Sequence, residues 1–255
     1  MRRASSVSLT SINLKGTPIP GAEDRQKLIP GWDQEAYSKA SVVCIGAGGI
    51  VSHIAPTLCR KGIGKITLID RDIVEVSNLN RQRFYINDVG SNKAIALAEN
   101  LRSECIAATE ICGLALNVEE ALERRMDLSC DLAICGVDNN PARVAASRYF
   151  RSKRIPVIFS AVSRDGDHGY IFVQERSGPC ICCLFPDITD DDRYPCPGTP
   201  AIADVLQAIG AMVVYAVDSL LVNRNRVWNY RRVSLADQRS DGAFLVPIRN
   251  FCSMH

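Results

Sequence analysis

Residues 41–45 read SVVCI and run directly into Gly46-Ala47-Gly48-Gly49, after which residues 50–60 have helical spacing. The short β-branched run predicts a buried strand, the glycines predict a tight turn, and the spacing beyond them predicts a helix. A second strand is predicted at 65–69, KITLI, and ends in Asp70-Arg71-Asp72. Two strands joined by a helix of this length form a right-handed crossover in a parallel sheet.

Strands and helices continue to alternate as far as residue 160. The predicted elements are a helix at 93–103, a strand at 110–116, a helix at 118–126, a strand at 132–135, a helix at 141–152 and a strand at 157–160. Beyond them we predict strands at 170–174, 227–234 and 243–248, with no helix between the last two. The expected fold is a Rossmann-like, doubly wound, mostly parallel α/β sheet with an antiparallel C-terminal extension.

The expected organisation is one domain, 24–255, behind an N-terminal tail, 1–23. Within the domain, 170–255 hold the antiparallel extension, a polar loop at 187–200 and a C-terminal end with metal-binding character. Residues 205–222 are apolar, but Gln207 and Asp218 interrupt them, and a charge near mid-membrane costs about 2.5–3.5 kcal/mol. This stretch therefore predicts a buried helix rather than a membrane span.

Charge and cysteine usage narrow the function classes. Thirty basic and 28 acidic residues give a formal charge of +2, so bulk charge implies no nucleic-acid partner. The N-terminal residues lack the apolar run of a signal peptide, and we expect a cytoplasmic protein. Eleven cysteines without such a signal argue against a disulfide framework and leave metal ligation, catalysis or core packing open.

The glycine turn and Asp70 together indicate a nucleotide site. Glycines let backbone approach phosphates, and the amides at a helix N-terminus point at them. The turn lacks the third glycine of the dinucleotide fingerprint, since Val51 stands at that spacing. Asp70 follows the second strand about twenty residues on, where a carboxylate accepts hydrogen bonds from ribose hydroxyls.

The chain resembles a known superfamily from Asp24 to its last residue. The resemblance rests on residues 70–82, DRDIVEVSNLNRQ, on Gly90-x-x-Lys93, and on Asp138-Asn139-x-x-x-Arg143. These motifs are similar to those of the activating-enzyme superfamily that includes MoeB, ThiF and the adenylation domains of ubiquitin-activating enzymes. The sequence departs from the family at Ile50-Val51-Ser52, where Leu-Gly-Ser is usual, so the first helix is expected to pack differently on the sheet.

The resemblance implies an enzyme that binds ATP and Mg²⁺ and adenylates a carboxylate. Gly46, Gly48 and Gly49 would face the phosphates and Asp70 the ribose. Asn78, Arg81 and Lys93 would contact the three phosphates, with Asp72 and Gln82 beside them. Asp138 would hold Mg²⁺, and Arg25 would reach into the neighbouring active site of a homodimer. Cationic groups suit this chemistry because charge develops on the α-phosphate as pyrophosphate leaves.

Two cysteine pairs predict a zinc site. Cys180-x-x-Cys183 and Cys252-x-x-His255 together supply four ligands of the kind that structural zinc sites use. The resemblance supports this pairing, with His255 in place of the usual cysteine, and Cys182 is expected to face away from the metal. Six other cysteines are expected to pack in the core: Cys44, Cys59, Cys105, Cys112, Cys130 and Cys135.

Cys196 stands in the loop 194–198, YPCPG, where some family members carry a cysteine that links to the activated carrier. A loop suits a mobile nucleophile, and an ordinary exposed cysteine is the alternative. His53 on the first helix is expected to be structural, and His168 is expected to lie in a turn.

The implied substrate is the C-terminal carboxylate of a small ubiquitin-like or sulfur-carrier protein, which would give an acyl-adenylate and pyrophosphate. Three alternatives stay open: adenylation of a short ribosomal peptide, an inactive scaffold subunit of a heterodimer, and an NAD-dependent oxidoreductase. The retention of Arg81, Lys93 and Asp138 argues against an inactive subunit and against an oxidoreductase, which needs no such groups.

Overall fold

The computed structural model describes residues 10–163, 165–188, 201–237, 241–252 and 254–255. Its strands are β1 (Ser11–Lys15), β2 (Ser41–Ile45), β3 (Lys65–Ile69), β4 (Glu110–Leu114), β5 (Leu132–Cys135), β6 (Val157–Val162), β7 (His168–Gln174), β8 (Tyr230–Ser234) and β9 (Gly242–Phe244). Its helices are α1 (Asp24–Lys27), α2 (Gln34–Lys39), α3 (Gly49–Arg60), α4 (Lys93–Leu101), α5 (Val118–Glu123), α6 (Asn140–Ser152), α7 (Ile181–Leu184) and α8 (Ala203–Leu221). Short 3₁₀ turns lie at Val76–Asn78 and Ile86–Asp88.

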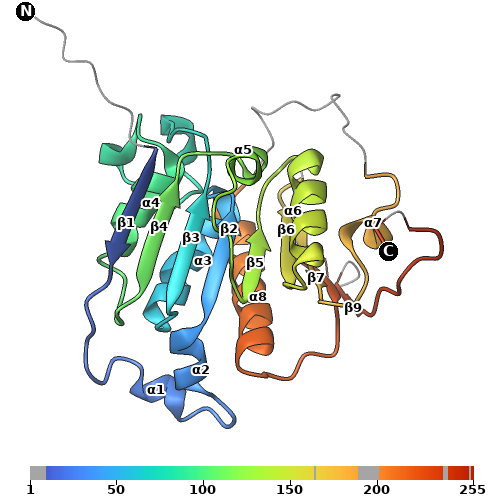
Figure 1. The fold of residues 1–255 in the computed structure, drawn as a ribbon, viewed down its shortest axis with the longest axis horizontal. Coiled ribbons are helices and arrows are strands. Elements are labelled where there is room, and N and C mark those ends of the chain that lie inside the picture. Colours follow the sequence, from blue (N-terminus) through green and yellow to red (C-terminus); the bar gives the residue numbers. More distant parts are fainter. Residues whose placement is uncertain (1–9, 164, 189–200, 238–240, 253) are drawn as a thin grey trace, which may run out of the picture.

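One sheet joins all of these strands in the order β1-β4-β3-β2-β5-β6-β7-β8-β9 (Figure 1). The central strands, β4 to β6, are parallel, whereas β7, β8 and β9 continue the sheet as antiparallel neighbours. The order reverses at β2, which pairs with β3 on one side and β5 on the other. The predicted doubly wound sheet with an antiparallel extension is confirmed.

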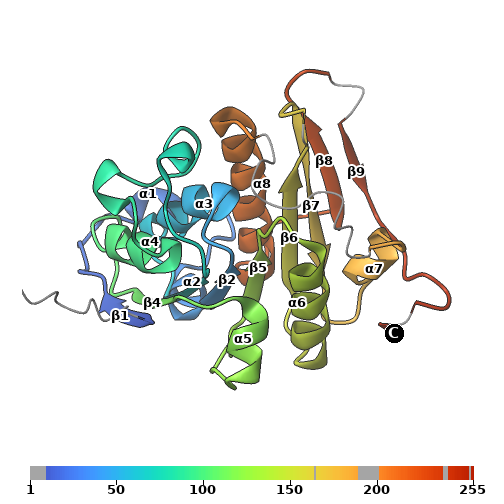
Figure 2. The same cartoon turned by 90° about the horizontal axis from the view of Figure 1, so that it is seen from above.

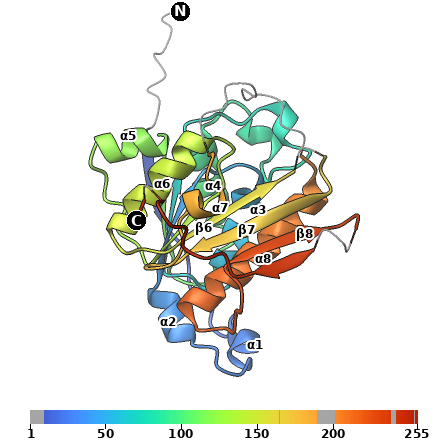
Figure 3. The ribbon, with the colours of Figure 1, turned by 90° about the vertical axis from the view of Figure 1, so that its right-hand side faces the viewer.

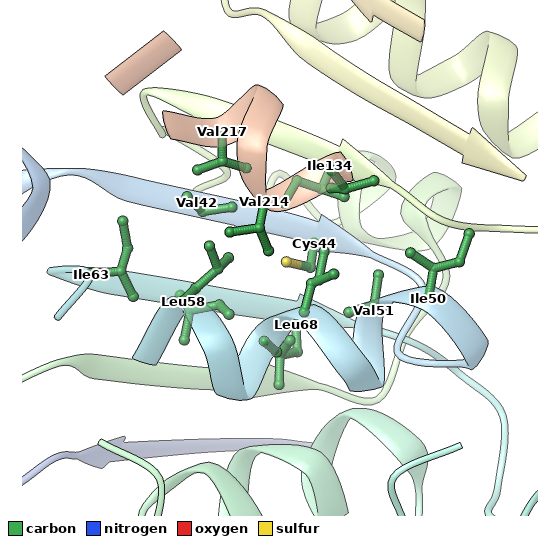
Figure 4. Close-up of a cluster of buried hydrophobic side chains, with 14 of the residues drawn as sticks. Val42, Cys44, Ile50, Val51, Leu58, Ile63, Leu68, Ile134, Val214 and Val217 are labelled. Atoms are coloured by element: carbon green, nitrogen blue, oxygen red, sulfur yellow. The ribbon is translucent and has the colours of Figure 1, made fainter. Parts of the chain in front are cut away.

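Helices cover both faces of the sheet. Figure 2 shows α3, α4 and α8 on one face and α5 and α6 on the other. The first face buries a large apolar cluster in which Leu58 of α3 and Val217 of α8 pack on Val42 and Leu68 of the sheet (Figure 4). The opposite cluster places Phe150 of α6 on the strand side chains that point the other way. Because strand side chains alternate between faces, the strands buried on both sides read as continuous apolar runs.

The N-terminal region corrects one expectation. Residues 11–15 lie in the predicted tail 1–23 but form β1, which pairs antiparallel with β4 at the edge of the sheet. Ile12 and Leu14 pack on the core while their neighbours face outward. A single five-residue alternation is weak evidence in a sequence, and only the free edge of β4 makes this segment a strand.

Helix α8 has the length and apolar composition of a membrane span, but here it packs along α3, β6 and β7. Gly210 allows the close crossing, since a Cβ there would lie 3.1 Å from Ile54 Cγ2. The fully buried Asp218 binds Lys61 at the end of α3, and Arg224 Nη1 lies 2.9 Å from its second oxygen. The predicted buried helix is confirmed, and its charge is paired.

We expect Asp218→Asn to lower the free energy of unfolding by about 3 kcal/mol, because removing one charge leaves Lys61 partly buried without its counter-ion. Urea unfolding measures the change. Glu35→Gln is the matched control, because Glu35 and Lys39 form an exposed ion pair whose loss should cost less than about 1 kcal/mol. Equal effects of the two substitutions would contradict this account.

Candidate functional site

The glycine turn lies at the carboxyl end of β2, where the strand order reverses. Gly46 has a φ of +87°, which disfavours residues with a side chain, and a Cβ there would lie 3.3 Å from the Gly136 carbonyl. Gly48 is the N-cap residue of α3. Helix α8 packs closely on Gly49, because a Cβ at this position would lie 3.0 Å from Leu206 of α8. These glycines let α3 begin close to the carboxyl end of the parallel strands, and backbone amides at such a helix N-terminus are donors of the kind that bind phosphate.

Val51 stands where the family usually has a small residue. Its side chain is fully buried, and a Cβ on Gly136 would lie 3.0 Å from Val51 Cγ2. The larger residue on α3 thus faces a glycine just beyond β5. Gly136 leaves room for the Val51 side chain between α3 and the sheet.

Asp70 joins the glycine turn to the segment that follows β3. Its carboxylate accepts hydrogen bonds from the backbone N–H of Ala47, at 2.7 Å, and of Asp72, at 2.8 Å. Burial raises the pKa of Asp70, and these two donors oppose the rise. The carboxylate thus organises the backbone of the glycine turn and of the segment that follows β3.

Lys93 opens α4 beside Asp72. Lys93 Nζ lies 3.2 Å from the Asp72 carboxylate, and the Lys93 side chain is mostly buried. Asn92 caps α4 and donates through Nδ2 to the carbonyls of Asp70 and Asp72, at 2.8 and 3.0 Å. Asn92 was missed in the sequence, although an Asn before a helix is a recognisable N-cap signal. It fixes the place from which Lys93 extends.

The segment 75–83 is held in place by helix α3. His53 Nε2 bonds to the Arg81 carbonyl at 2.9 Å, and the Arg83 N–H donates to Ser52 Oγ at 3.1 Å. His53 is therefore structural, as predicted, and burial lowers its pKa. No local sequence signal identified these contacts, because their partners are about thirty residues apart.

Side chains of this segment reach the glycine turn or bind backbone. Asn78 is buried and accepts from the Glu75 N–H at 3.1 Å, while Arg81 donates to the Ser77 carbonyl at 2.5 Å. Gln82 lies across the turn, 3.7 Å from the position of a Cβ on Gly48. Its Oε1 is buried, with no hydrogen-bond partner among the described residues. A hydroxyl or amino group of a bound nucleotide is the kind of donor that this oxygen lacks.

Asp138 lies three residues beyond β5 and is exposed. The backbone on either side of it is fixed, because Arg143 donates twice to the Val137 carbonyl and Asn139 caps α6. Strands β3, β2 and β5 are parallel neighbours, so their carboxyl ends share one edge. The fold thus brings Asp70, the glycine turn and Asp138 to the same edge, with Lys93 tied to Asp70 through Asn92.

Two predicted residues lie apart from this group. Arg25 is exposed on α1, and its neighbour Gln26 donates to the Lys61 carbonyl beyond the C-terminal end of α3. Figures 1 and 3 show α1 and α2 beyond the end of the sheet where β2 begins, opposite the glycine turn. Cys196 lies outside the described residues.

The cysteine pairs do come together. Ligand atoms of Cys180, Cys183, Cys252 and His255 all lie within 4.8 Å of one another. Figures 1 and 3 show the C-terminus beside α7, which carries the first pair. His255 Nε2 is 3.4 Å from Cys183 Sγ, and its Nδ1 lies 2.6 Å from an Arg151 nitrogen. Cys182 is outside this cluster and packs against the second apolar cluster, as expected.

Most other cysteines are packing residues. Cys44, Cys59, Cys105 and Cys135 are buried, while Cys112 and Cys130 are half-buried. Burial raises the pKa of Cys135 to about 11 and that of Cys130 to about 12. Both stay neutral thiols near pH 7, which does not favour nucleophilic catalysis.

A cavity of about 600 Å³ lies elsewhere. It is lined by residues that precede β2, β5 and β6, including Ala40, Asp131 and Pro156. It therefore opens at the amino edge of the sheet, opposite the glycine turn. The chemistry-bearing side chains, and not this cavity, mark the candidate site.

Comparison with known proteins agrees with this geometry. A sulfur carrier protein adenylyltransferase from Thermus thermophilus is 32% identical over 184 residues, 69% of this chain and 66% of that protein. The adenylyltransferase and sulfurtransferase MOCS3 of Xenopus laevis is 34% identical over 158 residues, 60% of this chain and 34% of that protein. This chain thus matches about two thirds of the first relative's length and about one third of the second's.

Solved structures agree on the fold. The crystal structure of Escherichia coli MccB with ATP superposes with a TM-score of 0.71 at 23% identity, over 87% of this chain and 68% of that one. The model of the ThiF family matches residues 23–248, which include the glycine turn, Asp70, Lys93, Asp138 and the first cysteine pair. Cys252 and His255 lie beyond the matched residues. The chain belongs to the ThiF family.

Proposed function

We propose that the chain is an adenylyltransferase that uses ATP and Mg²⁺ to activate the C-terminal carboxylate of a small ubiquitin-like or sulfur-carrier protein. The observation that carries this proposal is the shared edge at which Asp70, the glycine turn and Asp138 meet. Membership of the ThiF family and the adenylyltransferase activity of the similar proteins support it.

Positively and negatively charged residues have different roles in this proposal. The α3 amides and Lys93 neutralise phosphate oxygens, and Asp138 supplies a carboxylate for Mg²⁺, a cation that prefers oxygen ligands. The substrate carboxylate attacks the α-phosphorus, a new P–O bond forms, and pyrophosphate leaves with the electrons of the broken bond. Mg²⁺ held by Asp138 would offset the negative charge that develops on the phosphates.

A short peptide is the second candidate substrate. Escherichia coli MccB, solved with MccA, superposes on this chain with a TM-score of 0.71. A peptide and a carrier protein both offer a terminal carboxylate, so the same residues serve either one. The two substrates differ in what surrounds the carboxylate and not in the reaction.

We expect ATP–pyrophosphate exchange that depends on a carrier ending in Gly-Gly or on a peptide acid, and we expect Asp138→Ala to lower it at least about 100-fold. Asp131→Ala is the matched control, because Asp131 precedes the same strand, β5, at the opposite edge and bonds Ser41. Exchange that both substitutions lower equally, or binding of NADH but not of ATP, would refute the proposal.

We further propose a homodimer in which Arg25 of one protomer serves the site of the other. The support is its position at the far end of α3 from its own glycine turn. Cys196 stays a candidate acceptor thiol on the sequence resemblance alone.

If so, Arg25→Ala and Asp138→Ala should each be inactive alone, while a co-expressed mixture should recover roughly a quarter of the activity. Half of randomly paired dimers are mixed, and each mixed dimer has one complete site of two. Exchange assays on the mixture measure the recovery. No recovery in mixed dimers that are shown to form would contradict a shared site.

We propose zinc for the cysteine cluster. Three thiols and an imidazole are a donor set that zinc takes in tetrahedral sites, and their spacing fits one ion. Burial raises the pKa of the Cys180 thiol, and a bound cation favours the thiolate instead. An Arg151 N–H faces His255 Nδ1, so ligation through Nε2 moves the ring proton to Nδ1 and requires this guanidinium to turn away.

We expect Cys252→Ser to abolish stoichiometric zinc and to destabilise the protein by about 3 kcal/mol at a free zinc concentration 100-fold above Kd. Elemental analysis and thermal unfolding measure the two effects. Cys182→Ser, one residue from a proposed ligand, should keep its zinc. Full zinc in the Cys252 variant would exclude this site.

A further inference from the structure

The hairpin between β6 and β7 carries a hydrogen-bonded group of three side chains. His168 Nδ1 lies 2.6 Å from Asp167 Oδ1, and Ser163 Oγ donates to the same oxygen at 2.9 Å. The hydrogen bond from His168, and then that from Ser163, hold the pKa of Asp167 below its usual value. A carboxylate only accepts, so Nδ1 carries a proton, and in the neutral ring Nε2 is left as an acceptor.

This group lies at the same sheet edge as the nucleotide-site residues. In the pairing of β5 with β6, Cys135 lies opposite Phe159. Asp138 is three residues beyond Cys135, and Ser163 is four beyond Phe159. The Ser163 N–H donates to the His168 carbonyl at 2.8 Å, which places His168 beside Ser163 at the start of β7. His168 is thus two strands away from the strand that leads to Asp138.

The positions of the strands separate a nucleotide side from a substrate side. The glycine turn follows β2, and Asp70 and Lys93 follow β3, so the proposed nucleotide residues lie on one side of Asp138. His168 lies on the other side. Neighbouring strands are about 4.8 Å apart, so two strand spacings span about 10 Å, and an extended peptide covers that distance with about three residues. A tail whose carboxylate lies beside Asp138 would pass His168 about three residues before its end.

His168 is partly exposed at the end of a row of aromatic side chains on β7. His168 alternates with Tyr170 and Phe172 along β7 and therefore points to the same face as they do. The Tyr170 ring packs 5.3 Å from that of Phe185 and 5.9 Å from that of Tyr230, so aromatic side chains adjoin His168 on this face. The His168 side chain keeps 26% of its exposure, so a ligand can reach it.

We propose that His168 is a specificity-determining residue that accepts a hydrogen bond, through Nε2, from a backbone N–H of the acyl substrate's tail about three residues before the reacting carboxylate. Asp167 and Ser163 are positioning residues, because they fix the ring that makes this contact. The inference rests on the proposed adenylation of a carboxylate tail. The same three side chains also stabilise the hairpin, and the test below separates the two roles.

The test uses the full chain and a sulfur-carrier protein ending in Gly-Gly. We expect His168→Phe to raise the KM for the carrier about tenfold, since one hydrogen bond contributes up to about 1.5 kcal/mol, while kcat and the KM for ATP stay unchanged. His168→Gln restores a side-chain acceptor and should recover part of the loss. Thermal unfolding reports separately on the hairpin.

Carrier tails identify the donor. Proline placed in turn at the second, third and fourth positions from the end removes one N–H each time, and alanine at the same positions is the control. At one position, proline should raise the KM of the wild-type enzyme about as much as His168→Phe does, and the two changes should not add.

The outcomes separate this inference from the proposed function. No exchange by the wild-type enzyme with this carrier refutes both. Exchange with a KM unaffected by His168→Phe, with a loss in kcat alone, or with fully additive effects at every tail position overturns only the role of His168.

Discussion

The crossing of the glycine turn over the backbone beyond β5 is the constraint on which the site depends. Gly46 must adopt a positive φ within contact distance of Gly136, so that α3 can begin at Gly49, four residues after β2 ends at Ile45. A side chain at Gly46 would push the turn away from Val137, which precedes Asp138. One contact between two backbone segments therefore places both the amides that we propose for the phosphates and the carboxylate that we propose for Mg²⁺.

Around this contact, the structure holds the reactive groups mainly through backbone hydrogen bonds. Asp70 accepts from the glycine turn, Asn92 donates to the carbonyls of Asp70 and Asp72, and His53 bonds to the carbonyl of Arg81. Such bonds fix the path of the chain, and they therefore fix the backbone positions from which the Arg81 and Lys93 side chains extend. At the other end of α3, the buried pair of Lys61 and Asp218 joins α3 to α8. Helix α3 thus connects the candidate site to the segment that bears Arg25.

The sequence by itself determined the central fold and most of the candidate site. β-branched runs followed by glycines gave β2, the turn and α3 correctly, because these signals are local and the strands are buried on both faces. Asp70 was placed at a strand end by the same logic. The sequence also predicted one metal site made of two pairs, Cys180 with Cys183 and Cys252 with His255. The spacing within each pair is typical of zinc ligands and limits which residues can share an ion. Arg25 was recognised by family resemblance, not from its surroundings.

The tertiary structure alone decided features that depend on partners far apart in the chain. Residues 11–15 form a strand because they pair with the free edge of β4. The Val51 side chain lies against Gly136, a contact between positions far apart in the sequence. Local sequence contains neither fact. His168 read as a turn residue, and only the register of β5, β6 and β7 places it at the edge that carries Asp138. Periodicity is local to a segment, whereas register and close contact are properties of the assembled sheet.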